Sequence, residues 1–355
     1  MDHATFADRT AHGVVDVRRG DDALEALSAG EGFWAVVATF EGAVTAVRFA
    51  HVEPRMPGGP AGALGEVSTP VTPPPVWRPL DGDWHTSLDR DAYVAAVQEV
   101  RSRIAAGTVY QVNVCRVVSH RLDDGDDLDG LDALLRQGNP APHAARIRCD
   151  EAGLDVVCAS PELYLGVRDG RVVSRPIKGT APTAEQLLPK DHAENVMIVD
   201  LVRNDLSPVS RPGTVSVDEL CVVETHPGLV HLVSTVSGRL RPGTTWRDVF
   251  AAAYPPGSVS GAPKSSALQA ITDLEPVPRG PYCGAVGWVD AGAGAAELAV
   301  GIRTFWAERD AGGERWLRFG TGAGITWHSD PVGEWRETEL KAARLVGLAA
   351  GAVSP

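Results

Sequence analysis

The chain has 355 residues, 44% of them hydrophobic, which suffices for one large core or two smaller ones. Its formal net charge of −13 argues against a nucleic-acid or membrane-surface partner, because both call for basic patches. The five cysteines are scattered, the N-terminus lacks a basic then apolar signal pattern, and no apolar run approaches the roughly 20 residues of a membrane span. We therefore expect a cytoplasmic protein with reduced thiols.

The first 80 residues are expected to form a short β region and an extended connection. Residues 33–40 and 43–50 are β-prone runs separated by a Glu-Gly turn signal. From Pro54 to Pro79 the composition shifts to proline and glycine, which is typical of a linker. We therefore place a boundary near residue 80 and assign residues 81–355 to a second, larger domain.

The next stretch predicts a helix, a strand and a loose connection. Apolar residues recur at i, i+4, i+7 and i+11 from Tyr93, which predicts a helix over residues 90–106. In the strand that follows, Gln111 and Asn113 interrupt apolar neighbours, and the simpler interpretation is the solvated face of a half-buried strand. Residues 123–142 carry no strong pattern and are expected to be irregular.

A β-hairpin is predicted with an acid, Glu162, at one end and an amine, Lys178, at the other. Two β-prone runs, Leu163–Val167 and Arg171–Ile177, flank a strong turn signal at Asp169-Gly170. A three-residue loop would bring the acid and the amine to the same face, whereas a two-residue loop would put them on opposite faces. A surface hairpin with both groups solvated is the simpler alternative.

Two predicted helices each carry a pair of carboxylates on one face. Asp191 and Glu194 lie i, i+3 at the start of a helix over residues 191–206, which is apolar nearly all round and is therefore expected to be buried. Glu334 and Glu337 have the same spacing on the C-terminal helix. A solvated face with an i, i+4 Glu to Lys pair is the alternative for this second helix. Buried carboxylates need a partner or a metal, and sites with oxygen ligands alone favour Mg²⁺.

Other features predict an anion site with less specificity. His231 lies in a strand-like run, where a lone histidine is more often a satisfied core residue than a catalyst. The segment S-V-S-G-A-P-K predicts the start of a helix, capped by Ser260 or Gly261, whose free N–H groups would meet an anion. The string G-T-G-A-G at 320–324 permits close approach of backbone N–H groups to an anion, although it lacks the context of a dinucleotide-binding turn. These features, with the arginine of I-R-T, suggest a site for a small polyanion and a hard cation.

From Trp84 to Leu348 the chain carries a series of motifs, which are, in order, Y-Q-V-N, S-P-E, P-I-K-G-T, A-E-N-V-M-I-V-D-L-V-R-N-D-L, H-L-V-S-T-V, S-G-A-P-K, I-R-T, G-A-G-I and E-T-E-L-K. In these motifs the chain resembles the chorismate-utilising enzymes. The resemblance implies an α+β fold of two packed, largely antiparallel sheets flanked by helices. It also implies Mg²⁺-dependent chemistry on chorismate.

The resemblance implies that two positions distinguish the branches of this family. The water-using members carry a lysine at the position of Gln111, and glutamine cannot activate water in that way, so the nucleophile implied here is ammonia. The anthranilate synthases carry alanine at the position of Lys178. Both positions therefore favour the branch that makes 4-amino-4-deoxychorismate for para-aminobenzoate, in a folate or an antibiotic pathway that the sequence does not distinguish. An anthranilate or 2-amino-2-deoxyisochorismate synthase, and a silent chorismate-binding subunit, are the alternatives.

The resemblance also implies a role for each matched residue. Lys178 would be the covalent nucleophile, Glu162 the general acid and base, and His231 a neighbour of the leaving hydroxyl. Glu194 and Glu337 would bind Mg²⁺, with Asp191 and Glu334 as further or water-mediated partners. The implied substrate contacts are Gln111, Gly179, Thr180, Trp288, Arg303, Gly322, Ala323, Gly324 and Lys341.

One departure from the family pattern and one absent motif affect these implications. Trp288 stands where the family has tyrosine, so a phenolic hydrogen bond to the substrate is lost. None of the five cysteines stands on a glycine-flanked turn with a paired histidine, as a glutaminase nucleophile would. A separate glutamine amidotransferase subunit is therefore expected to supply the ammonia.

Overall fold

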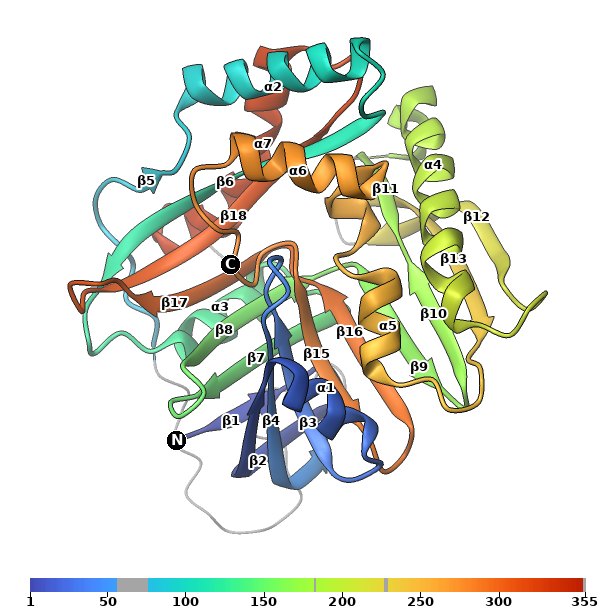
Figure 1. Ribbon diagram of the computed structural model, residues 1–355. Coiled ribbons are helices and arrows are strands. Elements are labelled where there is room, and N and C mark those ends of the chain that lie inside the picture. The colour runs from blue at the N-terminus through green and yellow to red at the C-terminus, as the bar shows by residue number, and fades with distance from the viewer. Residues whose placement is uncertain (56–75, 182, 227–228, 354–355) are drawn as a thin grey trace.

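The computed structural model describes residues 1–55, 76–181, 183–226 and 229–353 (Figure 1). Most of the predicted proline-rich and glycine-rich connection lies outside the described residues. The first strands are β1 (His3–Thr5), β2 (Arg9–Arg19), β3 (Phe33–Ala38), β4 (Val44–Pro54), β5 (His85–Thr86), β6 (Gln111–Leu122), β7 (His143–Cys149), β8 (Leu154–Ser160) and β9 (Leu163–Arg168). The later strands are β10 (Arg171–Arg175), β11 (Ile177–Ala181), β12 (Ser216–His226), β13 (Leu229–Arg239), β14 (Gly261–Ala262), β15 (Ala285–Asp290), β16 (Ala295–Val300), β17 (Thr304–Arg309) and β18 (Arg315–Ile325).

The helices are shorter in total than the strands and lie on the outside of the sheet network. They are α1 (Gly20–Ser28), α2 (Arg90–Ala105), α3 (Leu128–Gly138), α4 (Pro189–Leu206), α5 (Trp246–Ala253), α6 (Lys264–Leu274) and α7 (Pro331–Ala349). Three single turns of 3₁₀ helix are η1 (Ala184–Gln186), η2 (Ser207–Val209) and η3 (Gly257–Val259). The helices and strands together confirm the predicted α+β class.

The strands form one antiparallel network that is continuous in hydrogen bonding. Their spatial order is β6, β18, β17, β8, β7, β1, β2, β4, β3, β15, β16, β9, β10, β13 and β12. β5 and β14 pair with opposite ends of β6, and β11 continues β10 along one edge of β13. The short strand β1 pairs with both β2 and β7, so its hydrogen bonds join the N-terminal strands to the rest. A domain division at residue 80 stays a prediction.

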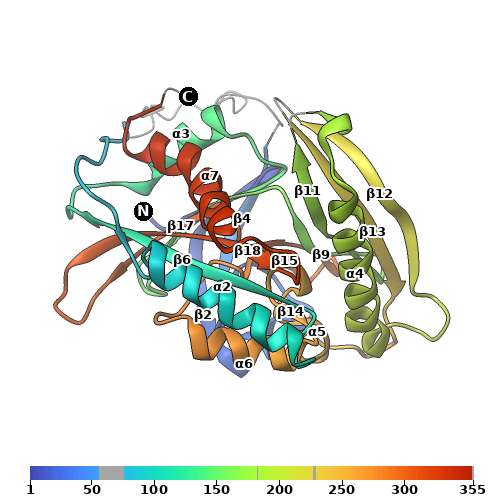
Figure 2. The same cartoon turned by 90° about the horizontal axis from the view of Figure 1, so that it is seen from above.

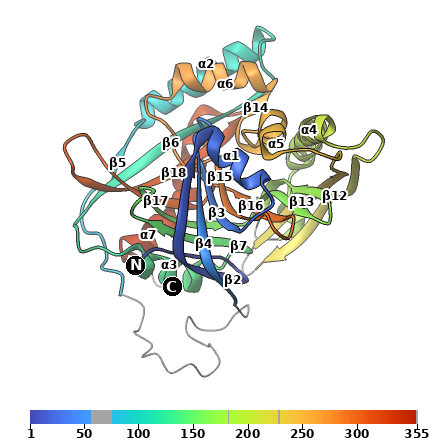
Figure 3. The same cartoon turned by 60° about the horizontal axis from the view of Figure 1, so that its bottom comes forward.

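The helices cover different parts of the strand network. α4 packs on β11, β12 and β13, and the view from above separates it from α2 and α7 (Figure 2). α1 lies over β2 and β4 and contacts α5, as Figure 3 shows from the lower side. The main apolar core lies between the strands and α1, α2, α4, α5 and α6, and a smaller one lies under α3 and α7. The candidate site lies where α4 faces the first turns of α7.

Three local predictions change in the structure. The strand β6 is buried from Gln111 to Val118, so Gln111 and Asn113 do not form a solvated face. Residues 123–142 include the helix α3, in which Asp127 accepts a hydrogen bond from Asp129 N–H at the N-terminus and Leu131 is fully buried. A cap followed by leucines at i, i+3 and i+7 is a helix signal that the sequence analysis did not use.

The segment S-V-S-G-A-P-K begins its helix later than predicted. Gly261 and Ala262 form β14 against β6, and α6 starts at Lys264 with Pro263 as its N-cap. Gly261 has φ of +147°, and a Cβ there would lie 2.2 Å from the backbone oxygen of Gln111. Only glycine allows this close approach, which brings the turn η3 against the strand that carries Gln111.

Candidate active site

The hairpin brings Glu162 and Lys178 together by a bulge and not by a three-residue loop. Arg171 pairs with Arg168, so the loop has only the two residues Asp169 and Gly170, whose φ angles of 52° and 68° are those of a type I′ turn. Between Val173 and Arg175 the register then shifts by one residue. One extra residue in a β-bulge moves the side chains beyond it to the other face of the hairpin, as one more loop residue would. Glu162 and Lys178 therefore lie on the same face.

Ser258 in the turn η3 links this acid and amine. The Nζ of Lys178 donates a hydrogen bond of 2.9 Å to the backbone oxygen of Ser258. The Ser258 side chain and the backbone of Ile177 hydrogen-bond the carboxyl of Glu162. Sequence reasoning passed over Ser258, because its segment was interpreted only as the start of a helix.

The two groups have pKa values shifted in opposite directions. Burial raises the pKa of Glu162 to about 7, although Ser258 and Lys178 act to lower it. Burial lowers the pKa of Lys178, against the attraction of Glu194 and Glu162. A carboxyl with a raised pKa and an amine with a lowered pKa are better suited to exchange protons with a substrate than the same groups in water.

The glycine string lies inside the strand β18 and not in a loop. Side chains at alternate positions would collide with β6 or its neighbours: a Cβ at Gly322 would lie 2.6 Å from the Sγ of Cys115, and one at Gly324 would lie 2.4 Å from the Nε2 of Gln111. Ala323 points the other way and is fully buried. The glycines therefore bring β18 close to Gln111, and the Cβ position of Gly324 is 3.7 Å from the Nζ of Lys178.

Gln111 is the second polar group beside Lys178. Only 2% of its surface is exposed. Its Oε1 has no hydrogen-bond partner among the described residues. A buried carbonyl oxygen without a donor is costly, so it is well placed to accept a hydrogen bond from a bound molecule.

Three of the four predicted carboxylates, those of Glu194, Glu334 and Glu337, face one cavity of about 570 Å³. Its lining residues include Lys190, Ala193, Glu194, Met197, Thr326, His328, Ser329, Asp330, Gly333, Glu334 and Glu337. α4 and α7 thus present their acidic faces to each other. Only one face of α4 is buried, with Val196 48% exposed, so the helix is not buried all round as predicted.

The acidic groups in this cavity interact with one another and with Lys178. Burial raises the pKa of Glu194 and of Glu334, and a neighbouring carboxylate adds to the rise in each case. The pKa of Glu337 is lowered: burial would raise it, but the ammonium of Lys341, 2.7 Å away, outweighs that effect. Lys190, which sequence reasoning did not single out, lies on the same cavity and attracts all three carboxylates.

The described residues do not hold three of these acids in a ready-formed metal cluster. Asp191 has another contact, because its carboxylate accepts a hydrogen bond of 2.8 Å from the N–H of Leu188 at the start of α4. Glu194, Glu334 and Glu337 nevertheless supply only oxygen donors to one cavity, which is the donor chemistry that a hard cation prefers.

The strands β11 and β13 position the next predicted residues. Thr180 Oγ1 and His231 Nδ1 lie 2.8 Å apart, so they form a hydrogen bond across the two strands. Gly179 has φ of +85°, and a Cβ there would lie 2.8 Å from the Cβ of Asp191. β11 can therefore approach the first turn of α4 only with glycine at this position.

Arg303 forms no ion pair with a carboxylate among the described residues. Burial lowers the pKa of its guanidinium. Its φ of +52° is unusual for a residue with a side chain. An unneutralised, partly buried guanidinium is suited to bind a carboxylate.

Trp288 is not brought to this group of residues. It lies in β15, where its ring stacks on Phe33 with centroids 5.7 Å apart, and the guanidinium of Arg9 lies 3.7 Å from its ring centroid. Its side chain is 3% exposed and belongs to the main apolar core. Trp288 thus packs against Phe33 of β3 and Arg9 of β2, and the predicted substrate contact through it stays a prediction.

Buried polar contacts hold the two sides of the site together. Arg279 donates hydrogen bonds to the backbone oxygens of Asn113 (2.7 Å) and Val259 (2.9 Å) and to the carboxylate of Glu275 (2.6 Å). It thereby connects the strand of Gln111 with the turn of Ser258. The pair Arg279 and Glu275 has i, i+4 spacing, which sequence alone does not distinguish from a surface ion pair.

Comparison with known proteins agrees with this geometry. Residues 52–347 match the family described as chorismate binding enzyme. Aminodeoxychorismate synthase component 1 from Klebsiella aerogenes is 37% identical over 281 residues, which are 75% of this chain and 60% of that protein. Anthranilate synthase component 1 from Saccharolobus solfataricus is 40% identical over 267 residues, which are 72% of this chain and 61% of that protein. The chain thus spans about 60% of the length of these curated relatives.

Solved structures share the fold at lower identity. Anthranilate synthase component I from Streptococcus pneumoniae superposes with a TM-score of 0.79 at 22% identity, covering 97% of this chain and 92% of that one. The menaquinone-specific isochorismate synthase from Escherichia coli superposes with a TM-score of 0.82 at 19% identity, covering 98% and 88%. Because one family description matches most of the sequence, the chain belongs to the family of chorismate binding enzymes.

Proposed function

We propose that this chain is the synthase component of an aminodeoxychorismate synthase, which converts chorismate and ammonia into 4-amino-4-deoxychorismate and water. The observation that carries the proposal is the pairing of Lys178 with Glu162 through Ser258, beside the unpartnered oxygen of Gln111. A nucleophilic amine and a carboxyl of raised pKa are the two groups that a covalent amination of a ring carbon needs.

In the proposed reaction the uncharged Nζ of Lys178 attacks ring carbon 2 while the hydroxyl on carbon 4 leaves. Glu162 takes the proton that the attacking amine loses and gives it to the leaving hydroxyl, which departs as water. Ammonia then attacks carbon 4, the Lys178 amine leaves carbon 2, and Glu162 moves the proton in the reverse sense. The atoms balance as chorismate plus ammonia giving product plus water.

The remaining site residues bind and orient the substrate in this proposal. Arg303 binds a substrate carboxylate, and Gln111 accepts a hydrogen bond from ammonia. His231, held by Thr180, lies near the leaving hydroxyl. The substrate is bordered by the closely packed backbone of Gly322, Ala323 and Gly324. Lys341 lies beside this backbone, because its Nζ donates a hydrogen bond of 3.1 Å to the Gly322 oxygen.

A bound Mg²⁺ would neutralise the ring carboxylate and polarise the conjugated ring. Glu194 and Glu337 would hold it, with Asp191 and Glu334 as outer or water-mediated partners. Turnover is then expected to stop when a chelator removes divalent ions and to return when Mg²⁺ is added. Activity that survives exhaustive chelation would contradict this assignment.

Anthranilate synthase is the second candidate, because relatives with that name are 40% identical to the chain. Lys178 favours aminodeoxychorismate, since the resemblance implies alanine there in anthranilate synthases. The test is to incubate the purified chain with chorismate, Mg²⁺ and ammonium salts and to identify the product. A product that needs a separate lyase to become para-aminobenzoate supports the proposal, whereas direct release of anthranilate overturns it.

No helix among the described residues has the length and apolar character that crossing a membrane requires. The five cysteines are free thiols, and the sulfurs of Cys115 and Cys283 lie 4.0 Å apart without a bond between them. These thiols support the further proposal that the reaction takes place in the reducing cytoplasm.

A further inference from the structure

The turn η3 carries the backbone oxygen that accepts a hydrogen bond from the amine of Lys178. This bond, from Nζ to the Ser258 oxygen, is 2.9 Å long. An uncharged amine has one lone pair, and an N–H that donates to a fixed acceptor restricts the direction in which this lone pair points. The residues that hold Ser258 in place therefore influence the direction in which Lys178 can attack.

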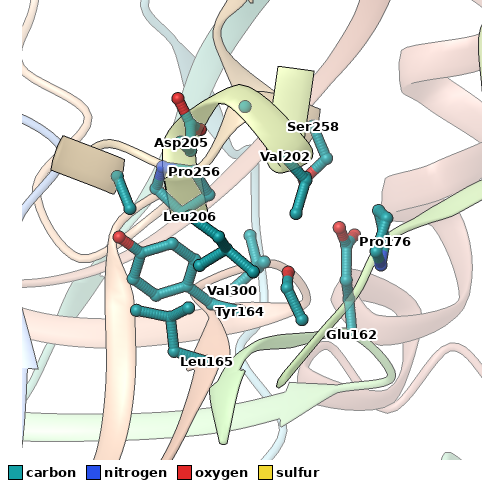
Figure 4. Close-up of a pocket in the computed structure, with 13 residues that line it drawn as sticks. Glu162, Tyr164, Leu165, Pro176, Val202, Asp205, Leu206, Pro256, Ser258 and Val300 are labelled. Atoms are coloured by element: carbon teal, nitrogen blue, oxygen red, sulfur yellow. The ribbon is translucent and has the colours of Figure 1, made fainter. Parts of the chain in front are cut away.

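The hydrogen bonds inside η3 are longer than usual. The N–H of Val259 donates to the Pro256 oxygen over 3.3 Å, and that of Ser260 donates to the Gly257 oxygen over 3.4 Å. Most N–H···O bonds in proteins measure about 2.9–3.0 Å. Pro256 and Ser258 also line a small internal cavity of about 10 Å³, so close packing is incomplete on that side of the turn (Figure 4). The position of the turn thus depends on contacts from outside it.

Arg279 supplies such a contact and connects η3 to the strand β6. Its guanidinium donates hydrogen bonds to the Val259 oxygen of η3 (2.9 Å) and to the Asn113 oxygen of β6 (2.7 Å). The N–H of Asn113 in turn donates to the Ser260 oxygen over 2.8 Å. Both residues that follow Ser258 in the chain are therefore held by Arg279 or by its partner in β6.

Glu275 fixes the orientation of this guanidinium. Its carboxylate accepts hydrogen bonds from Nε (2.7 Å) and Nη2 (2.6 Å) of Arg279, and from the N–H of Cys115 in β6 (2.8 Å). The two side chains of the ion pair are 1% and 6% exposed. Desolvation offsets much of the attraction in a pair as buried as this one, so stability alone is a weak reason for its presence.

We propose that Arg279 is a positioning residue for the amination: it holds η3 against β6, so that the Ser258 oxygen keeps the amine of Lys178 aimed at the substrate. Among the described residues no hydrogen bond joins Arg279 directly to Lys178, so Arg279 acts through the turn. The role extends the proposed reaction to a residue outside the groups assigned above, and it rests on the proposed function of Lys178. A purely structural ion pair would support the fold without affecting the amine.

Arg279→Lys separates these two roles. Lysine keeps a positive charge beside Glu275, but it presents its donors from one nitrogen and cannot reach Glu275, Val259 and Asn113 together as the planar guanidinium does. The variant should therefore fold, while the Ser258 oxygen is no longer fixed. In turnover with chorismate and ammonium, kcat should fall about 10- to 100-fold, as expected for a reacting group misplaced by about 1 Å. KM should stay nearly unchanged, because the groups assigned to bind the substrate carboxylates remain.

A second test does not depend on chorismate. Acetic anhydride acetylates uncharged amines, and peptide mass spectrometry measures its rate of reaction with Lys178 across a series of pH values. An ammonium donates a stronger hydrogen bond than an amine does, so loss of the Ser258 acceptor in Arg279→Lys should move the midpoint of this labelling to lower pH. The charged groups that face Lys178 are unchanged in the variant; they are Glu162, Glu194, Glu337 and Lys341.

Arg146→Lys is the matched control. The side chain of Arg146 is also 1% exposed, and it forms ion pairs with Asp129 of α3 and Asp155 of β8. Its guanidinium likewise donates to backbone oxygens, those of Ile147 in β7 and Val156 in β8, which lie outside η3 and β6. This variant should lower the melting temperature and leave the labelling midpoint of Lys178 as in the wild type.

A further variant keeps the test decisive if Arg279→Lys does not fold. Replacing both Arg279 and Glu275 by methionine removes the two charges together and leaves no unpaired buried ion. A wild-type labelling midpoint in the variant that folds refutes the positioning role, and so does a loss of kcat no larger than that of Arg146→Lys. If the midpoint shifts but the wild type does not turn over chorismate, the proposed function fails and the positioning of Lys178 by Arg279 stands.

Discussion

Glu162 is stable in its place mainly as an uncharged acid. Its ordinary pKa of 4.5 rises to about 7 through burial, so the folded protein binds this proton more tightly than the unfolded chain does. For a carboxyl with a raised pKa, the favourable contribution is fully present below pH 4.5 and is lost as pH rises through about 7. Above that pH the ionised form costs roughly 3 kcal/mol of folding free energy, at about 1.4 kcal/mol per pKa unit.

Glu162→Gln is therefore expected to abolish turnover and to stabilise the fold in alkaline solution. The amide keeps the size of the side chain but cannot ionise, so the gain in free energy of unfolding should be largest above about pH 7 and smallest near pH 4.5. Urea denaturation of both proteins across this range measures the effect. Equal stability differences at the two ends would show that Glu162 does not titrate as described.

Lys178 is expected to form a covalent adduct that can be trapped. Because ammonia is needed to release the amine, incubation with chorismate and Mg²⁺ but without ammonia should leave a mass increase that maps to Lys178. Lys178→Gln is the control and should show none. An unmodified wild type under these conditions would reduce Lys178 to an electrostatic role, and an adduct on another lysine would assign the nucleophile elsewhere.

At the scale of elements, the site depends on how closely β11 approaches α4. Gly179 is the point of contact, with a left-handed backbone and Asp191 2.8 Å from where its Cβ would be. Any side chain there must push the first turn of α4, and with it Glu194, away from Lys178. The carboxylates of α4 thus reach the amine only because one residue of β11 has no side chain.

Gly179→Ala should lower both stability and activity. A left-handed alanine costs about 1–2 kcal/mol, and the contact with Asp191 adds to that cost. Gly170→Ala is the matched control, since Gly170 also has a left-handed φ, of +68°, but nothing lies within 4 Å of its Cβ position. Denaturation curves and kcat compare the two. If Gly170→Ala is equally destabilising and Gly179→Ala keeps full activity, the close contact has no functional importance.

At the scale of the whole molecule, none of the thiols in the described part of the chain has the surroundings that glutamine hydrolysis needs. Cys115, Cys149, Cys158 and Cys283 are buried, and the hydrogen bonds of the thiols in the described residues involve no histidine. In the proposed reaction, ammonia would then come from solution or from a partner, in line with the predicted glutamine amidotransferase subunit.

The purified chain should therefore use ammonium salts but not glutamine. Activity with ammonium should rise with pH, because the proposed nucleophile is uncharged ammonia and its fraction increases. Adding a glutaminase subunit of an aminodeoxychorismate synthase should permit turnover with glutamine. Robust use of glutamine by the chain alone would refute this division of labour, and inactivity with ammonium at high pH would count against ammonia as the nucleophile.

Local sequence patterns by themselves determined the elements whose signals come from adjacent residues. The apolar stripe from Tyr93 and the cap at Asp89, whose side chain accepts a hydrogen bond of 2.9 Å from Ala92 N–H, predict α2 nearly to its ends. The hairpin runs, the α+β class and the family motifs were also readable. In each case the physical preference belongs to neighbours in the chain, such as a helical stripe, a turn with glycine or an i, i+3 pair.

The tertiary structure alone decided where those residues meet. The bulge lies in β9, which has one residue more than β10 between the pairs Val173–Gly166 and Arg175–Leu163. β9 shows the same shift against its other neighbour, β16, and no pattern inside the hairpin encodes that second partner. The place of Trp288 depends on Arg9 and Phe33, and the burial of Gln111 depends on β18 and β14. These contacts join residues far apart in sequence, so their energies are set by packing and not by local preference.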